Sequence, residues 1–360
     1  MTGFEVLQPG SGPIRGSAYL PSTPDHVLWG RLPCAADDAV LTVEPGTEVT
    51  FDTVSHEGIL EDQGRDPKAF FGQYDVAGVL DDAIEIAASE VSHTFGVDGP
   101  HVVSRPVRVS GARPGDLLAI TVVETLPRVP YGLISNRHGK GALPGEYPRE
   151  GDVFSAYADL NAAGTHGRLP LQQGGEPLVE FPLAPFLGIM GVAVTGDARP
   201  HSVPPGAHGG NIDINLLTVG STLYLPVQVE GALAYVGDPH FAQGDGEVSL
   251  TAMEASLRAT VRLDVVPHED AVRRFGELAG PLAETAEHLV PTGMDEDLDV
   301  AVQNCVRAAI ALLESRYGMD PRLAYAYLSA ATDFDISQVV DVVKGVHARI
   351  RKADFGKIDP

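Results

Sequence analysis

Short apolar stretches and turn residues alternate along the first two thirds of the chain. Residues 39–53 carry β-branched and aromatic side chains on either side of Pro45-Gly46, which predicts two strands around a turn. Apolar residues at every second position are also typical of strands that bury one face. The segments in which we expect further strands on this basis are 101–126, 186–194, 223–236 and 247–266. The pattern therefore favours a β-rich fold.

The last third of the chain changes to helical spacing. Residues 298–317 predict the strongest helix, with an apolar stripe that includes Val302 and Leu313, and Gly318 is a typical helix end. Asp320-Pro321 predicts the start of another helix. An earlier helix is expected within 76–88.

We expect a mainly β fold with α+β elements, in which residues 1–360 form one catalytic unit. Its β-rich part would span 1–267, and a helical C-terminal portion, 268–360, would pack against it.

Residues 127–180 look like a long loop, because Gly, Pro, His, Arg and Asn are dense there. A loop of this length in a compact enzyme is usually functional or disordered. We expect it to cover the site and shape substrate choice, with Tyr131 and Phe154 as apolar walls and Arg137 and His138 as polar ones.

Composition excludes some classes of partner. Lys plus Arg number 25 and Asp plus Glu number 49, so the net charge is −24, which opposes binding to phosphate backbones and anionic lipid. We therefore expect no nucleic acid and no membrane partner. Two isolated cysteines and no apparent signal segment lead us to expect a cytoplasmic protein.

The densest group of chemically active side chains is G-D-P-H-F-A-Q-G-D-G-E at 237–247. Its glycines would let the backbone turn and bring the acids and the histidine to one point. Acids this close repel one another unless a cation or a proton lies between them. The alternative is an ordinary acidic turn or an incidental Ca²⁺ loop. The group contains Asp238, His240, Gln243, Asp245 and Glu247.

Two further groups have a similar composition. Residues 201–215 contain His201, His208, Asn211 and Asp213 beside Gly209-Gly210, where backbone N–H groups or an amide could bind a carbonyl oxygen. A hydrogen-bonded turn before a strand explains this segment equally well. Residues 51–58 place Asp52 at a strand end and His56 shortly after it.

In order, these segments resemble the acetamidase/formamidase family. The resemblance is carried by H-S-V-P-P-G-A-H-G-G-N-I-D at 201–213, G-D-P-H-F-A-Q-G-D-G-E at 237–247 and T-A-M-E at 251–254, and it extends over most of the chain. It implies hydrolysis of small amides to a carboxylate and ammonia, a β-sandwich or barrel architecture, a divalent metal and a homo-oligomer, either a dimer or a larger assembly.

The residue types suit this chemistry on their own. A divalent metal polarises the carbonyl and lowers the pKa of bound water, and zinc in catalytic sites keeps three protein ligands and one open position. We predict metal ligands among Asp52, His56, Asp238 and His240, so that 51–58 and 237–247 should meet in space.

Glu247 is the predicted general base, and Asn211 with the backbone near Gly210 would bind the carbonyl oxygen. Asp213, Gln243 and Asp245 would orient these groups or hold a second ion such as calcium. His201 and His208 are further candidates for substrate contacts.

Other activities remain open. The same scaffold could act on cyclic amides (a lactamase) or on esters, and acid–base catalysis without metal is a further option. A Ca²⁺-stabilised β-rich binding protein is the non-enzymatic alternative.

Overall fold

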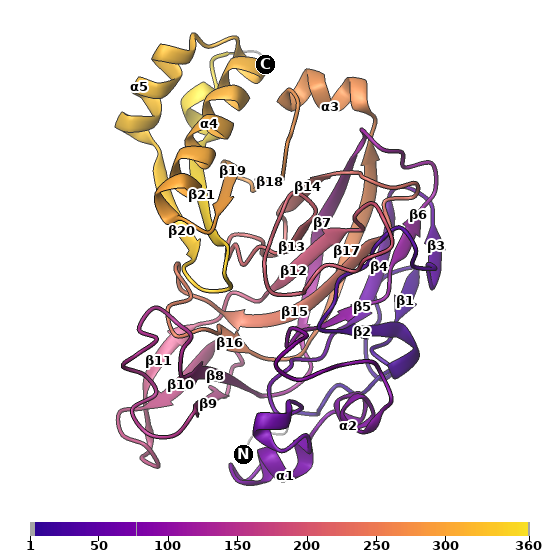
Figure 1. Cartoon of the computed structure of the whole chain (residues 1–360), viewed down its shortest axis with the longest axis vertical. Coiled ribbons are helices and arrows are strands. Elements are labelled where there is room, and N and C mark those ends of the chain that lie inside the picture. Colours follow the sequence, from indigo (N-terminus) through magenta and orange to yellow (C-terminus); the bar gives the residue numbers. More distant parts are fainter. Residues whose placement is uncertain (1–3, 77, 359–360) are drawn as a thin grey trace.

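A computed structural model describes residues 4–76 and 78–358 of this chain. One large sheet has nine strands, most of them antiparallel to their neighbours, and Figure 1 shows how it runs through the molecule. In spatial order its strands are β1 (Ala18–Leu20), β4 (Thr47–Asp52), β17 (Leu257–Val266), β7 (Leu117–Pro127), β14 (Thr222–Pro226), β18 (Leu282–Glu284), β19 (His288–Asp295), β21 (Lys344–Arg351) and β20 (Asp333–Gln338).

A second sheet has twelve strands and includes β15 (Ala234–Ala242), which pairs with four neighbouring elements. Its main path is β11 (Pro177–Pro182), β10 (His166–Pro170), β9 (Val153–Leu160), β8 (Tyr131–Arg137), β16 (Met253–Glu254), β15, β12 (Phe186–Val192) and β13 (Gly209–Asn211). The strands off this path are β2 (Val27–Trp29), β3 (Leu41–Val43), β5 (Val102–Ser104) and β6 (Val107–Val109).

The main core lies between the two sheets. Buried residues such as Phe51 and Val261 of the first sheet share one hydrophobic cluster with Phe186 and Val236 of the second. Each contributing strand places alternate side chains on this inner face, as a period of two residues requires. The predicted β-rich architecture is confirmed, and the two sheets form a sandwich.

Five α-helices lie at the two ends of this sandwich within the described residues. The helices α1 and α2 lie near the N-terminus, and α4 and α5 lie beside β19–β21 at the opposite end (Figure 1). The bounds are α1 Pro67–Gly72, α2 Asp81–Ala88, α3 His268–Phe275, α4 Leu298–Tyr317 and α5 Pro321–Ala331. Three short 3-10 helices cover Pro24–His26, Glu61–Gln63 and Lys352–Phe355.

The helix α4 has the predicted bounds, and its buried face includes Leu313 of the predicted stripe but not Val302. Its buried residues include Ala301, Cys305 and Ala309, whereas Val302 is 36% exposed. The reason is the close approach of the helix to β19, where a side-chain carbon added at Gly293 would lie 2.1 Å from the backbone nitrogen of Cys305. Small side chains must therefore face the strand, although larger apolar residues are available one position away.

The prediction of a long loop over 127–180 is wrong. The strands β8 to β11 pair antiparallel there and leave only the connection 138–152 as a long irregular segment. Polar residues such as Asn136, Asp159 and Arg168 interrupt the apolar pattern of these strands, and glycine and proline are concentrated in their turns, so the apolar signal of a strand is weak.

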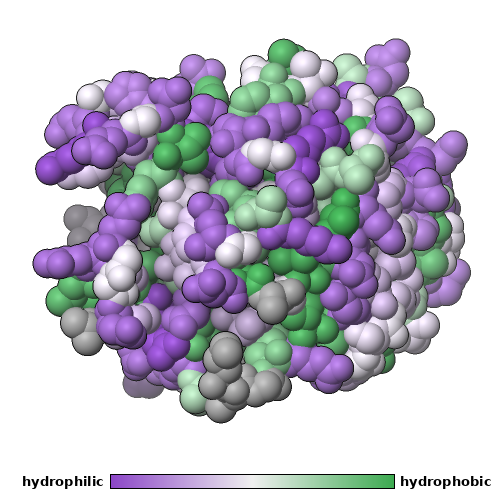
Figure 2. Space-filling view, turned by 90° about the horizontal axis from the view of Figure 1, so that it is seen from below, coloured by the Kyte–Doolittle hydropathy of each residue, from purple (hydrophilic) through white to green (hydrophobic). Residues whose placement is uncertain are grey.

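The C-terminal residues 268–360 also contribute strands. In addition to α3, α4 and α5, they supply β18 to β21, which extend the nine-stranded sheet. On the face seen from below, hydrophilic residues dominate and hydrophobic ones form smaller areas between them (Figure 2). In the described part of the chain, no helix is both long enough and apolar enough to cross a membrane.

Candidate active site

Strand β15 carries two of the candidate ligands. Asp238 and His240 lie within it, so this part of 237–247 is strand and not the predicted glycine turn. Gly237 serves a different purpose, because a side-chain carbon there would lie 2.6 Å from the carbonyl oxygen of Val102. The glycine allows β5 to approach β15 closely. The turn itself begins only after Ala242.

Neighbouring strands add two more potential metal ligands. Glu254 of β16 is the register partner of His240, and its Oε1 lies 3.1 Å from His240 Nε2. Val103 of β5 pairs with Gly237, which places His101, one residue before β5, near Asp238. The distance from His101 Nε2 to Asp238 Oδ2 is 3.7 Å. Sheet pairing therefore sets these side chains side by side.

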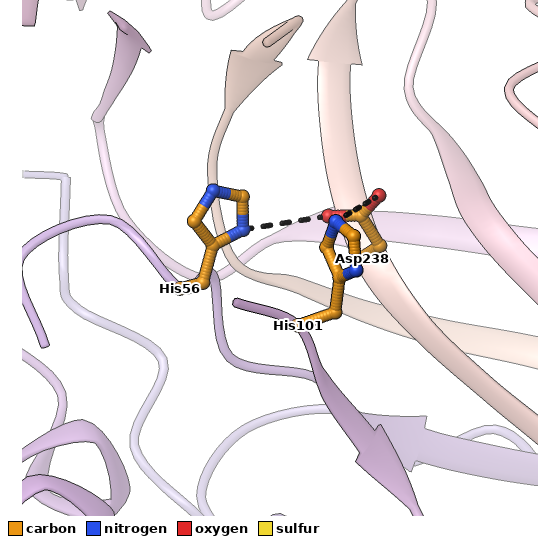
Figure 3. A group of neighbouring side chains, drawn as sticks. All are labelled: His56, His101 and Asp238. Carbon is orange, nitrogen blue, oxygen red and sulfur yellow. Dashed lines mark ion pairs between the residues drawn. The ribbon is translucent and has the colours of Figure 1, made fainter. Parts of the chain in front are cut away.

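His56 approaches from the other sheet. It follows β4, and its Nδ1 lies 3.6 Å from Asp238 Oδ1. Figure 3 shows ion pairs from the imidazoles of His56 and His101 to the Asp238 carboxylate. The structure thus brings 51–58 and 237–247 together, as predicted. All three side chains are buried, and each offers a ligand atom within 4.8 Å of the others.

A second group adjoins the first. Asp213, His240 and Glu247 also offer ligand atoms within 4.8 Å of one another. Asp213, Asp238 and Glu247 have backbone φ values of +46°, +51° and +48°, in the left-handed region. This conformation is uncommon for residues other than glycine, and it is often found at functional sites.

Many polar atoms in these groups lack hydrogen bonds. Within the described residues, His56 Nδ1, Glu247 Oε2, Glu254 Oε2 and both Asp213 carboxylate oxygens are buried without a partner. Buried polar atoms normally have hydrogen-bond partners. A group of buried nitrogen and carboxylate oxygen atoms without such partners therefore indicates a site where these atoms could bind a cation. The residues therefore fit a divalent metal.

The charges reinforce this interpretation. Burial alone would lower the pKa of His56, yet the neighbouring carboxylates of Asp238, Glu57 and Glu254 raise that pKa to about 10. Burial lowers the pKa of His101 to about 4. Burial and the charges of Asp213 and Asp341 raise the pKa of Glu247 well above its usual value. The crowded carboxylates repel one another, and a bound cation would relieve this repulsion.

A cleft of about 410 Å³ opens onto the cluster. His56, His101, Asp238, Glu247 and Glu254 line its floor, and residues of 137–144 and 339–344 form walls. A larger groove of about 880 Å³ lies beside α4, and none of the cluster residues line it. Chemistry, and not volume, therefore identifies the site.

The structure places Asp52 away from the cluster. Its carboxylate accepts two hydrogen bonds from Arg258, at 2.6 and 2.9 Å, and another from the Tyr19 hydroxyl at 2.5 Å. Arg128 adds a third charge at 3.8 Å. With both oxygens engaged by cationic and phenolic donors, Asp52 is part of a buried ion-pair network.

Three other candidates lie around the cluster. Asn211 donates from its side chain to Asp341 at 2.8 Å, so one of its amide N–H groups is already used. Gln243 donates to the Asp213 carbonyl at 2.7 Å and supports that turn. Asp245 accepts a hydrogen bond from Asn215 at 3.1 Å and belongs to none of the groups of potential metal ligands among the described residues.

The five candidates for substrate contacts lie outside the residues that line the cleft. Tyr131 is buried against Phe71 and donates to the Gly78 carbonyl, and His138 is exposed. His208 is half-buried, its desolvation lowers its pKa to about 4, and it packs beside Gly210. His201 is half-buried, and its ring accepts from the Val203 backbone.

Sequence reasoning missed several residues of the site. His101 follows Gly99-Pro100 directly before a strand, a position similar to that of His240 after Pro239, but one histidine alone carries little signal. Glu254 lies in the quoted T-A-M-E segment and was not assigned as a ligand. Lys140, Asp341 and Lys344 line the cleft without any local pattern that marks them.

Gly188 of β12 provides a sharp test of the cluster geometry. A side-chain carbon there would lie 2.5 Å from Asp213 Oδ1, 2.6 Å from His240 Cε1 and 2.8 Å from Asp238 Oδ2. We expect Gly188→Ala to displace these donors and to lower metal content and amide hydrolysis together. Gly72→Ala is the matched control, since nothing lies within 4 Å of its added carbon. Equal activity in the two variants would show that the donors do not need this packing.

Comparisons with known proteins show the family of this chain. The model of the acetamidase/formamidase family matches residues 73–200 and 195–350. A formamidase of Methylophilus methylotrophus is 27% identical over 305 residues, which cover 67% of this chain and 74% of that protein. An acetamidase of Mycolicibacterium smegmatis is 28% identical over 239 residues, covering 51% of this chain and 57% of that protein.

A solved structure shows the same fold. The acetamidase from Bacillus halodurans superposes with a TM-score of 0.74 at 23% identity, over 94% of this chain and 99% of that one. At this identity the likeness concerns the fold alone, whereas the match of the family model covers more than half of the sequence.

Proposed function

Because this chain belongs to the acetamidase/formamidase family, we propose that it hydrolyses small linear amides to a carboxylate and ammonia with water activated at the buried histidine–carboxylate cluster. The observation that supports this mechanism is that buried histidine nitrogens and carboxylate oxygens without hydrogen-bond partners converge on the floor of a cleft. Amides are poor electrophiles with poor leaving groups, so both the carbonyl and the attacking water need activation.

His56, His101 and Asp238 would hold the catalytic metal. Two imidazoles and one carboxylate are a common ligand set for catalytic zinc, and these three residues also line the cleft. A divalent ion held there polarises the amide carbonyl and lowers the pKa of water from 15.7 towards about 7. Asp213 and His240 would adjoin this ion, and a carboxylate–imidazole pair suits zinc better than calcium, which takes oxygen ligands.

Neighbouring side chains orient the imidazoles of the proposed metal ligands. His101 Nδ1 lies 2.9 Å from Ser202 Oγ, so the ring presents Nε2 to the cluster. Glu57 lies 3.4 Å from His56 Nε2 and is itself held by Ser135 and Arg137. Such partners fix the tautomer and direction of a ligand imidazole.

Glu247 is the proposed general base. Its side chain lines the cleft beside the proposed ligands, and burial with the charges of Asp213 and Asp341 raises the pKa of its carboxyl above the usual value. It would take a proton from the attacking water and deliver it to the amide nitrogen, so that ammonia can leave as the carbon–nitrogen bond breaks. Asn211, Asp213 and Gln243 would support this arrangement through Asp341 and the surrounding turns.

Hydrolysis and metal content should be measured on the same preparation. We expect protein purified without chelator to contain zinc and to release ammonia from formamide and acetamide, and dialysis against a chelator to remove both properties. Rates on matched esters and lactams test the alternatives on the same scaffold. Metal with no turnover of any amide, ester or lactam would favour the metal-stabilised binding protein instead.

Assembly and compartment belong to this proposal as well. Leu323 and Tyr325 of α5 are 62% and 61% exposed, which suits a contact between copies in a homodimer or larger homo-oligomer. Light scattering measures the subunit count directly. Both cysteines are buried and free, consistent with a cytoplasmic setting.

A further inference from the structure

Two lysines stand beside the cluster in a chain that has few. The sequence contains five lysines in 360 residues, and two of them, Lys140 and Lys344, line the cleft. Only three other lysines, Lys68, Lys352 and Lys357, occur in the chain, so two at one cleft form a local concentration. A pair of ammonium groups at one cleft is the usual way to attract an anionic ligand.

The segments that carry these lysines are fixed to the same short stretch of chain. The backbone N–H of Ala142 donates to the Val248 carbonyl at 2.9 Å, and that of Val339 donates to the Gly246 carbonyl at 2.9 Å. The β8–β9 connection and the β20–β21 turn are therefore anchored on either side of Glu247. This arrangement holds both lysine-bearing segments at a defined position relative to the proposed base.

The β20–β21 turn is strained. Asp341 and Val342 have φ values of +63° and +67°, and this conformation is a genuine outlier for a β-branched residue such as valine. Val342 is 58% exposed, so hydrophobic packing does not explain the conformation. The turn directs Asp341 and Lys344 to the cleft, and strain of this kind is typical of ligand-binding segments.

Neither lysine is neutralised by a salt bridge. Across residues 4–76 and 78–358, the one lysine–carboxylate pair within 4.0 Å joins Lys352 and Glu284, at 2.6 Å. Lys344 donates to the Val342 carbonyl, and Lys140 contributes only its backbone to a hydrogen bond. Both ammonium groups thus keep the capacity to bind a ligand.

The cleft is also too large for formamide or acetamide alone. Its volume of about 410 Å³ corresponds to about a dozen water molecules, at about 30 Å³ each. An amide of three or four heavy atoms would leave most of this space to solvent. Apolar walls from Leu250, Val339 and Val340 suit a short methylene chain between the amide and a charged end.

We propose that the preferred substrate is a primary amide whose acyl chain ends in a carboxylate, that is, the monoamide of a short dicarboxylic acid. Lys140 and Lys344 bind the carboxylate, and the amide lies at His56, His101 and Asp238. This inference rests on the proposed amide hydrolysis and names the substrate class for the same site. The repulsion from acids beyond about 8 Å is screened at physiological ionic strength, and the proposed metal would offset the carboxylates that line the cleft itself.

The test compares amides of the same size that differ in charge. Succinamate and glutaramate each carry one amide and one carboxylate, whereas succinamide and glutaramide are their uncharged counterparts. We expect kcat/KM to be about ten-fold higher or more for the better monoamide than for its diamide, the usual scale of a charge-assisted hydrogen bond. In the double variant Lys140→Gln/Lys344→Gln this ratio should fall to near one, mainly through a higher KM. Lys68→Gln, on the exposed surface of α1, is the control and should keep the wild-type ratio.

Binding of the product provides a readout independent of turnover. We expect succinate or glutarate to bind the wild-type protein by calorimetry and to bind the double variant at least ten-fold more weakly. A wild-type enzyme that hydrolyses acetamide but does not prefer either monoamide overturns this inference and leaves the proposed function intact. Equal losses for monoamides and diamides in the double variant also overturn it, since the lysines would then only balance the carboxylate cluster. Failure to hydrolyse any amide refutes the proposed function itself.

Discussion

Glu247→Gln is expected to lower kcat for acetamide by about 10²-fold or more. The amide side chain has nearly the same shape as the carboxylate but cannot accept the proton of the attacking water, and general acid–base catalysis commonly contributes 10² to 10⁴-fold. Zinc at His56, His101 and Asp238 should remain, because Glu247 is not in that group. Steady-state kinetics and elemental analysis on the same sample measure both quantities.

The matched control for this variant is Asp245→Asn. Asp245 lies two residues away but binds Asn215 outside the cluster, so we expect a kcat within a few-fold of the wild type. A near-normal kcat in Glu247→Gln would assign the base to another carboxylate, and Glu254, which also lines the cleft, is the first to test.

His101→Ala is expected to abolish zinc binding and amide hydrolysis together. The variant removes one of three ligands from the proposed metal, whereas Ser202→Ala removes only the partner that orients the His101 ring at 2.9 Å. Loss of such an outer partner typically weakens metal binding by 10- to 100-fold, and loss of the ligand itself should exceed this. Titration of zinc into the metal-free protein ranks the two variants.

Asp52→Ala tests whether Asp52 is a metal ligand, as expected from the sequence, or a member of a buried ion-pair network, as the structure supports. Because Asp52 pairs with the buried Arg258 and Arg128, its removal should lower the free energy of unfolding by about 3–5 kcal/mol, the usual cost of leaving a buried charge unpaired. The folded variant should still bind zinc with the wild-type stoichiometry. Loss of zinc from a variant that is otherwise folded would return Asp52 to the ligand set.

Local periodicity determined much of the fold. The alternation near Val261, the spacing of 298–317 and the helix signals around Gly318 and Asp320-Pro321 predicted real elements, because these patterns reflect which face each segment buries. The failure over 127–180 has the same physical origin. Strands that polar residues interrupt and that glycine-rich turns connect lack the apolar contrast on which such predictions depend.

The sequence by itself also determined the kind of chemistry, since acids and histidines packed among glycines limit the options to a cation or shared protons. It did not determine which donors meet. His101 joins the site only because β5 pairs with β15, and Asp52 leaves it only because Arg258 lies opposite on β17. Both outcomes depend on contacts between residues more than 100 positions apart. Local sequence fixes a side chain's type and its face on an element, whereas pairing of distant strands decides its neighbours, and therefore whether a carboxylate meets an arginine or a metal.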